Sequence, residues 1–213
     1  MQQTIDKGYA VVVPGMQLGP GYRSKGNLPH HAVINPRKPS RVRVVLDCAA
    51  KVAGKSLNDL LYQGPDTTAC LVGILLRFRR GPVAVSADVE EMFMQVKVSK
   101  PDCGVLPFLW WPKSDIEKEP VEYQMTSHPF GAIFSPFCAN SALMKTAQKF
   151  SSDCDSSVGE SVLNNFYVDD CPVSFPNDED TKSFVVQLNE LMARGFKLKK
   201  WVTNSEMVRK VFP

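Results

Sequence analysis

Alternating apolar and polar residues predict several short β-strands along this chain. Residues 41–47 (RVRVVLD) alternate charged and β-branched side chains before they become apolar, which is typical of a strand with a basic face at its start. Residues 81–88 (GPVAVSAD) form a run of small apolar residues that indicates a buried strand and that ends in a carboxylate. Further strands are expected at residues 95–98, 105–111, 121–125 and 196–201.

Helical spacing of apolar residues predicts three longer helices. Residues 136–150 and 179–194 each carry this spacing. Another helix is expected after Asp66, which would cap it, and before the stop signal Gly81-Pro82.

Strands and helices follow one another without strict alternation. Residues 1–40 are rich in glycine and proline and are expected to be extended and loop-like. The remainder predicts an α+β fold with helices on one face of a sheet. With 213 residues, 44% hydrophobic and 22% charged, the chain can form one globular unit or two closely joined subdomains.

Charge and cysteine usage narrow the function classes only slightly. A net charge of +3 is mildly favourable for a nucleic-acid partner but does not indicate one by itself. No apolar run reaches the ~18 residues of a membrane span. The six cysteines show no Cys-x-x-Cys pair and no metal-ligand spacing with the three histidines, so reduced thiols of an intracellular protein are expected.

Two adjacent carboxylates, Asp169 and Asp170, are the first candidate for chemistry. They follow Tyr167-Val168, and the flanking runs 162–166 and 171–175 are expected to form two strands with the acidic pair in the turn between them. A buried Asp-Asp pair suffers like-charge repulsion and desolvation, which divalent cations would relieve. For the pair alone, an ordinary exposed acidic turn is an equally good interpretation.

Asp88, at the end of the predicted strand 81–88, favours the metal interpretation. Mg²⁺ prefers oxygen ligands and usually takes only one or two protein carboxylates, so Asp88 with Asp169 would suffice. Two such ions would suit an in-line nucleotidyl transfer. Without the acidic pair, Asp88 would be read as an ordinary strand-end residue.

Several short blocks follow one another along nearly the whole chain. They are LPHH (28–31), RVRVVLD (41–47), SLND (56–59), QGPD (63–66), ADVEEMF (87–93), FGA (130–132), SPFCAN (135–140), FYVDDC (166–171) and KW (200–201). In this order they closely resemble the reverse transcriptase of BEL/Pao long-terminal-repeat retrotransposons.

The resemblance implies the fingers and palm of a right-hand polymerase, with a ferredoxin-like palm whose antiparallel sheet is backed by helices. Residues 1–80 would be mainly fingers and 81–213 mainly palm, with 101–128 as a candidate return to the fingers. Implied partners are an RNA or DNA template-primer duplex, a dNTP, and the thumb and RNase H regions of a parent polyprotein, both absent here. The implied setting is cytoplasmic, within retrotransposon virus-like particles and with no membrane.

The resemblance also assigns a metal site. Asp88, Asp169 and Asp170 match the catalytic aspartates of the palm, with Asp169 as the direct ligand of the pair. The backbone carbonyl of Val89 is the expected extra ligand. The implied cofactor is a pair of Mg²⁺ ions, with Mn²⁺ as an alternative.

Nucleotide contacts are implied at further positions. Arg43 matches the fingers arginine that contacts the incoming nucleotide, and Arg41, Lys38 and Arg37 would complete a triphosphate clamp, the alternative being solvated charges on an exposed strand. Phe93 stands where an aromatic steric gate would exclude ribonucleotides, the alternative being a simple core aromatic.

The block at residues 130–136 resembles the motif beneath the template and incoming nucleotide. Gly131 would allow close backbone approach. Phe130 replaces a glutamine of the retroviral enzymes, so a polar contact there is not transferred to this chain.

Residues 195–201 (GFKLKKW) resemble the last palm motif, where a lysine is proposed to protonate pyrophosphate. Strand alternation places Lys197 and Lys199 on one face and Lys200 on the other, and spacing does not choose among them. Lys199 is the candidate general acid.

Two other functions remain open at this point. One is a truncated or domesticated remnant that binds nucleic acid or a protein partner without catalysis. The other is a different palm-fold nucleotidyltransferase such as a cyclase, which the ordered blocks disfavour.

Overall fold

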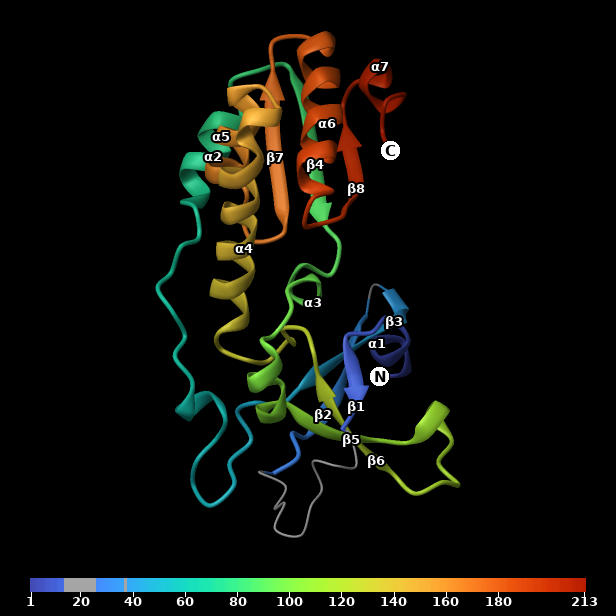
Figure 1. Ribbon diagram of the computed structural model, residues 1–213. Helices are drawn as coiled ribbons and strands as arrows, with labels where there is room; N and C mark the ends of the chain where they lie inside the picture. The colour runs from blue at the N-terminus through green and yellow to red at the C-terminus, as the bar shows by residue number, and fades with distance from the viewer. Residues whose placement is uncertain (14–25, 37) are drawn as a thin grey trace. The chain divides into compact units, whose positions relative to one another are not determined.

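The computed structural model describes residues 1–13, 26–36 and 38–213, with only the backbone described for residues 38–41. The chain divides into two compact units (Figure 1). The first consists of Met1–Gly64 and Phe93–Ser135, and the second of Pro65–Met92 and Pro136–Pro213. The assignment of fingers and palm to parts of the chain stays a prediction.

The first unit is built on two small antiparallel sheets. One has the strand order β1-β6-β5 and the other pairs β2 with β3. The strands are β1 (Ala10–Val12), β2 (His30–Asn35), β3 (Lys38–Leu46), β5 (Pro107–Trp110) and β6 (Val121–Met125). The short helices are α1 (Gln2–Asp6), η2 (Asn58–Leu60), η3 (Lys100–Val105) and η4 (Pro112–Ser114).

Cross-strand aromatic packing forms the core of this unit. Phe108 on β5 lies directly opposite Tyr123 on β6, and their rings stack with centroids 5.7 Å apart. Such a pair contributes about 0.5–1.5 kcal/mol beyond the burial of its area. Met125, two residues after Tyr123, is buried on the same face.

The second unit holds a three-stranded antiparallel sheet in the order β7-β4-β8, with β4 in the centre. The strands are β4 (Val83–Val89), β7 (Asp170–Phe175) and β8 (Leu198–Thr203). The helices are α2 (Leu71–Phe78), α4 (Ser135–Phe150), η5 (Ser151–Asp153), α5 (Ser156–Asn165), α6 (Asp178–Met192) and α7 (Glu206–Arg209), while α3 (Met92–Gln95) begins at the last residue of this segment. Helices α2, α5 and α6 pack against β7, and α6 also contacts β4 (Figure 1).

Alternation along β4 explains the packing of this sheet. Val85, Ala87 and Val89 are buried, whereas Ser86 and Asp88 between them are partly exposed. Because successive side chains of a strand point to opposite faces, one face of β4 is apolar and the other carries Asp88.

Several predicted elements are confirmed. Strands lie within or overlap residues 41–47, 81–88, 105–111, 121–125 and 196–201, and helices α4 and α6 match 136–150 and 179–194. The side chain of Asn177 caps α6 by accepting a 2.9 Å hydrogen bond from the N–H of Asp180. The α+β class with antiparallel sheets is therefore correct.

Four local predictions are wrong. Residues 162–166 are not a strand, because α5 continues to Asn165, and the buried Val158, Val162 and Phe166 recur every four residues, which is helical spacing. Residues 95–98 form no strand, since Lys97 makes only an isolated bridge to Ser127.

The other two concern Asp66 and the N-terminal region. Asp66 does not cap α2, which begins at Leu71; its carboxylate instead accepts a hydrogen bond from the N–H of Thr68. Residues 1–40 are expected to be loop-like; their described parts, which exclude residues 14–25 and 37, contribute α1, β1, β2 and the start of β3.

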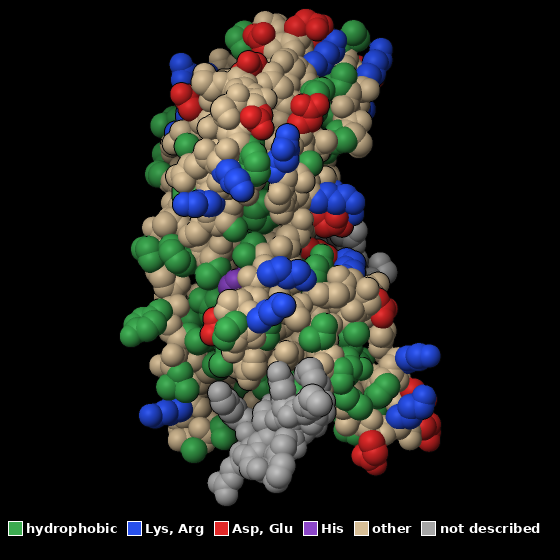
Figure 2. Space-filling model, in the orientation of Figure 1, with side chains coloured by type: hydrophobic (Ala, Val, Ile, Leu, Met, Phe, Trp, Pro, Cys, Tyr) green, Lys and Arg blue, Asp and Glu red, His purple; other side chains and the backbone are tan. Residues whose placement is uncertain are grey.

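Surface features agree with the composition. Acidic and basic side chains are interspersed over the visible face (Figure 2), as expected for a net charge of +3. All six cysteines are free thiols. Within the described residues, no helix combines the length and apolar composition needed to cross a membrane.

Candidate functional site

The acidic pair lies in a tight turn between α5 and β7. The N–H of Tyr167 donates to the carbonyl of Asp170 at 2.9 Å, and the N–H of Asp170 donates to the carbonyl of Tyr167 at 3.1 Å. Val168 has a φ of 58°, the left-handed region that a β-branched residue rarely adopts. The predicted turn is therefore present, although a helix and not a strand leads into it.

Strand pairing brings the third carboxylate to this turn. Asp88 on β4 is the direct cross-strand partner of Asp170 on β7, and residues in such pairs have Cβ atoms about 4.5–5.5 Å apart. The carbonyl of Asp169 accepts a 2.7 Å hydrogen bond from the N–H of Val89. Asp88, Asp169 and Asp170 thus gather at one end of the sheet, in the second unit.

Electrostatic strain accompanies this gathering. The pKa of Asp170 is raised, first by partial burial and then by the negative charges of Asp169 and Asp88, while Lys200 opposes the shift. Carboxylates held this close favour any cation that approaches them.

A lysine places a positive charge beside these carboxylates. The ammonium Nζ of Lys200 lies 2.5 Å from Oδ2 of Asp88, whose side chain is only 17% exposed. Lys199 forms an ion pair with Glu90, and Nζ of Lys197 lies 3.9 Å from Oε2 of the same residue.

A β-bulge explains why neighbouring lysines reach different acids. On β8, Lys199 is paired with Asp88 and Val202 with Ser86, so two residues of β8 lie opposite the single residue Ala87. Lys200, one of the two, has a φ of 54°. Such bulges re-aim side chains. Lys197 and Lys199 reach the same acid, as expected for side chains on one face, whereas Lys200 reaches Asp88.

The donor set suits a hard divalent cation. Among the described residues, no group of three or more His, Cys, Asp or Glu side chains is placed to hold a metal ion. Mg²⁺, however, requires only one or two protein carboxylates. The Lys200 ammonium against Asp88 shows that a positive charge already balances the carboxylate there. Binding of a metal ion at these carboxylates stays a prediction.

The predicted steric-gate residue lies in the first unit. The Phe93 ring packs on Phe130 with centroids 5.0 Å apart and a 44° tilt, and both residues are partly exposed. Phe130 thus packs against one side of the Phe93 ring by apolar contact.

Gly131 permits a close backbone approach within the same unit. Its φ is +107°, and an added Cβ would lie 2.0 Å from the carbonyl oxygen of Leu46. Asn58 fastens this segment, donating to the carbonyl of Gly131 and accepting from the N–H of Ile133, both at 3.0 Å. The sequence placed Asn58 in a block but could not assign it this contact, because its partners lie more than 70 residues away.

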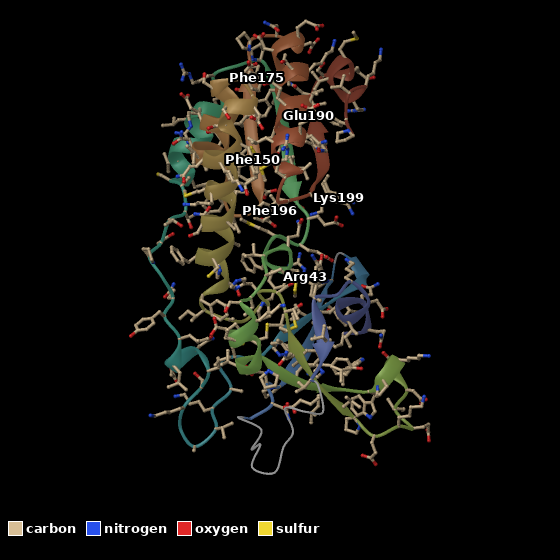
Figure 3. All side chains as sticks on the ribbon, viewed as in Figure 1. Arg43, Phe150, Phe175, Glu190, Phe196 and Lys199 are labelled. Carbon is tan, nitrogen blue, oxygen red and sulfur yellow. The ribbon has the colours of Figure 1, made fainter. Side chains whose placement is uncertain are left out.

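The structure describes the side chain of Arg43 but not those of the other basic residues predicted to bind the triphosphate. Arg43 is exposed on β3 opposite Val33, and Figure 3 labels it together with Lys199. Lys38 and Arg41 lie in β3 by their backbone, but their side chains fall outside the described part of the chain, and Arg37 lies outside it altogether. Their contact with a triphosphate stays a prediction.

Comparison with known proteins identifies the fold. No protein-family model and no curated protein matches the sequence. A foamy viral protease-reverse transcriptase in complex with double-stranded DNA matches 92% of this chain at 16% identity and a TM-score of 0.67. A mutant prototype foamy virus protease-reverse transcriptase matches 92% at 16% identity and a TM-score of 0.65.

These matches show a reverse-transcriptase-like fold of the retroviral type. They do not single out the BEL/Pao group. The chain spans about a quarter of the length of these proteins, 28% of the first and 22% of the second.

The strain at Asp170 predicts a pH-dependent stability difference. Because its pKa is raised in the folded state, ionised Asp170 destabilises the fold at neutral pH, and the penalty fades as the pH falls through the raised pKa and is gone below the ordinary value of 3.8. In EDTA, Asp170→Asn should raise the free energy of unfolding at neutral pH by about 0.5 kcal/mol, a value discounted for solvent screening. Urea unfolding at several pH values measures this.

Asp66→Asn is a control, for which the opposite change in the free energy of unfolding is expected. The N–H and hydroxyl of Thr68 lower the pKa of Asp66, so this variant should lose stability at neutral pH and recover as the pH falls. A stabilisation by Asp170→Asn that grows toward low pH would contradict the assignment.

Proposed function

We propose that this chain is the metal-binding and nucleotide-binding part of an RNA-directed DNA polymerase, of the kind found in BEL/Pao retrotransposons. It would transfer nucleotides from dNTP to a primer 3′-hydroxyl on an RNA or DNA template. The pairing of Asp88 with Asp170 beside the Asp169 turn carries the proposal. The reverse-transcriptase-like fold supports it.

Asp88 and Asp169 would hold the metal ions, with Asp170 and the Val89 carbonyl as additional ligands. Divalent ions bound there, Mg²⁺ or Mn²⁺, would supply activation of the primer hydroxyl and stabilisation of the departing pyrophosphate. Binding would relieve the repulsion that raises the pKa of Asp170. It would also require Lys200 to release Asp88.

The lysines at the end of β8 would then carry two roles. Lys200 would act as the counter-cation of Asp88 until metal binds. Lys199, which pairs with Glu90 at the same end of β4, remains our candidate for protonating pyrophosphate. An ammonium group placed near a leaving phosphate can donate a proton or simply stabilise its charge.

The first unit would supply the nucleotide contacts. The Phe93 ring, steadied by Phe130, would exclude a ribose 2′-hydroxyl. Arg43, with Arg41 and Lys38, would bind the triphosphate. The Gly131 segment would support the nucleotide through its backbone.

The wider setting is part of the same proposal. The chain would act in the cytoplasm, inside virus-like particles, as one segment of a polyprotein that also carries thumb and RNase H regions. Those regions would supply many of the contacts to the phosphate backbone of the duplex. Affinity for nucleic acid is largely a sum of such contacts.

Asp169→Asn tests the metal assignment. Primer extension on an RNA template with dNTP and Mg²⁺ or Mn²⁺ should fall by about a thousandfold or more, because metal ions contribute several kcal/mol to such transition states. The control Asp115→Asn changes a partly exposed carboxylate that pairs with Lys118 and accepts from the N–H of Glu117, and it should leave extension unchanged.

Two outcomes would argue against the proposal. Wild-type extension by the Asp169→Asn variant would remove the metal site from the mechanism. An unmodified chain that binds the duplex in Mg²⁺ and Mn²⁺ but extends no primer would favour the remnant that binds nucleic acid without catalysis.

Phe93→Ala tests the steric gate. Loss of the ring should raise incorporation of ribonucleotides relative to deoxyribonucleotides by about tenfold or more, since the discrimination comes from a clash. Phe93→Tyr keeps the ring and should keep the discrimination. Equal sugar selectivity in wild type and Phe93→Ala would reduce Phe93 to a packing residue.

Lys200→Ala tests the competition between lysine and metal. Without nucleotide or nucleic acid, Mn²⁺ should bind this variant about fivefold more tightly than the wild type, because one positive charge beside Asp88 is removed. Lys199→Ala removes an equal charge that contacts Glu90 instead and should change affinity by less than about twofold. Electron paramagnetic resonance of free Mn²⁺ measures both, and equal effects would refute a specific role for Lys200.

A further inference from the structure

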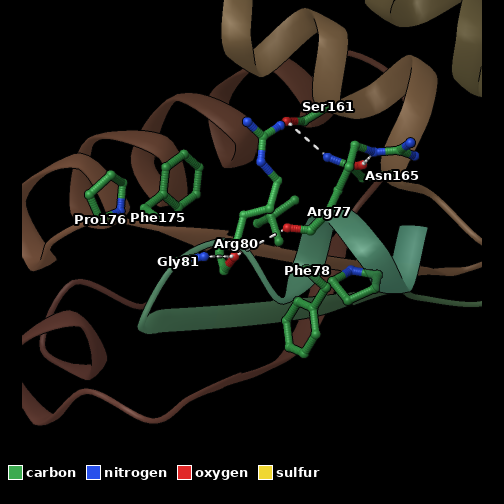
Figure 4. A pocket seen from close by; sticks show the side chains of 11 residues that line it. Arg77, Phe78, Arg80, Gly81, Ser161, Asn165, Phe175 and Pro176 are labelled. Carbon is green, nitrogen blue, oxygen red and sulfur yellow. Dashed lines mark hydrogen bonds between the residues drawn. The ribbon is translucent and has the colours of Figure 1, made fainter. Parts of the chain in front are cut away.

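A pocket of about 360 Å³ with both polar and apolar walls lies in the second unit, formed by α2, α5 and β7 (Figure 4). Its volume falls near the lower end of small-molecule sites. None of its lining residues belongs to the group Asp88, Asp169 and Asp170. The pocket is therefore separate from the proposed metal site.

The lining carries positive charge and no negative charge. Arg77 and Arg80 are among the lining residues, and neither aspartate nor glutamate is. Ser161 and Asn165 on α5 add hydrogen-bonding groups to the same wall. This combination favours an anionic ligand, since guanidinium groups pair well with phosphate oxygens.

The two arginines differ in how they are held. The Nε of Arg77 donates to Oδ1 of Asn165 at 2.7 Å, and its Nη2 donates to the carbonyl of Asn164. Among the described residues, none forms an ion pair or hydrogen bond with the Arg80 side chain. Figure 4 shows the Arg80 guanidinium directed toward the Ser161 hydroxyl. Arg77 is thus part of the wall, and Arg80 is the arginine available to a ligand.

The opposite wall is apolar and rigid. Phe175 and Pro176 lie away from Arg77 and Asn165 in Figure 4. The Phe175 ring packs on Phe184 with centroids 4.8 Å apart, which fixes its position. Gly81 lies against the backbone of Phe175, since a Cβ added at Gly81 would come 2.4 Å from the carbonyl oxygen of Phe175.

We propose that this pocket binds a nucleotide, with its phosphate at Arg80 and Ser161 and its base against Phe175. A flat ring beside an aromatic side chain stacks without regard to base identity. The nucleotide would be either free or part of a single strand, and both sources present the same phosphate and base.

Isothermal titration calorimetry in EDTA tests this with three probes: adenosine 5′-monophosphate, inorganic phosphate and a short oligothymidylate. Arg80→Gln should weaken binding of the nucleotide about tenfold, the usual cost of a lost charge-assisted hydrogen bond. The matched control Arg79→Gln removes the adjacent arginine, which does not line the pocket. It should change affinity by less than about twofold.

Phe175→Leu separates the two halves of the site. It should weaken the monophosphate about fivefold by removing a stacking surface and leave inorganic phosphate unchanged. Binding of the monophosphate alone would identify a free nucleotide, and tighter Arg80-dependent binding of oligothymidylate would identify a strand; either supports the proposal.

Other results would overturn it. These are no saturable binding of any probe, equal losses in Arg79→Gln and Arg80→Gln, or inorganic phosphate binding as tightly as the monophosphate. Asp169→Asn, which tests the polymerase proposal, should leave nucleotide affinity in EDTA unchanged. The two proposals can therefore fail separately.

Discussion

The antiparallel pairing of β4 with β7 is the constraint on which the candidate site depends. Backbone hydrogen bonds between these strands, and not attraction between side chains, set Asp88 opposite Asp170. Like charges directly opposite each other are destabilising in a sheet. The apolar faces of the same strands, with Val85, Ala87 and Val173 buried, offset that cost. The core therefore holds together acids that would otherwise separate.

Lysines of β8, which pairs with the other edge of the central strand β4, offset part of this negative charge. Asp88 lies on β4 and Glu90 directly follows this strand, whereas Lys199 and Lys200 come from β8 at its bulge. A regular strand would point consecutive side chains to opposite faces. The bulge opposite Ala87 thus lets two adjacent lysines pair with two acids, Asp88 near the end of β4 and Glu90 just after it.

The sequence predicted the fold class, most strands and the position of the acidic turn, because these follow from periodicity and from residues adjacent in the chain. It failed where local patterns were ambiguous. The run 162–166 contains apolar residues that suit a strand, and only its continuation back to Val158 shows the helical repeat. The Lys200–Asp88 contact and the Asn58 clamp join residues 112 and 73 positions apart. No single-sequence pattern carries that information.

The backbone conformation of Val168 constrains the shape of the turn that carries the acidic pair. A left-handed backbone is costly for a β-branched side chain, yet here it directs the carbonyl of Asp169 onto the N–H of Val89. Glycine at this position would relax the backbone and also let the turn sample other shapes. Val168 therefore restricts the backbone of the turn to few conformations. A more flexible turn would hold Asp169 and Asp170 in a less defined orientation, although both carboxylates would still be present.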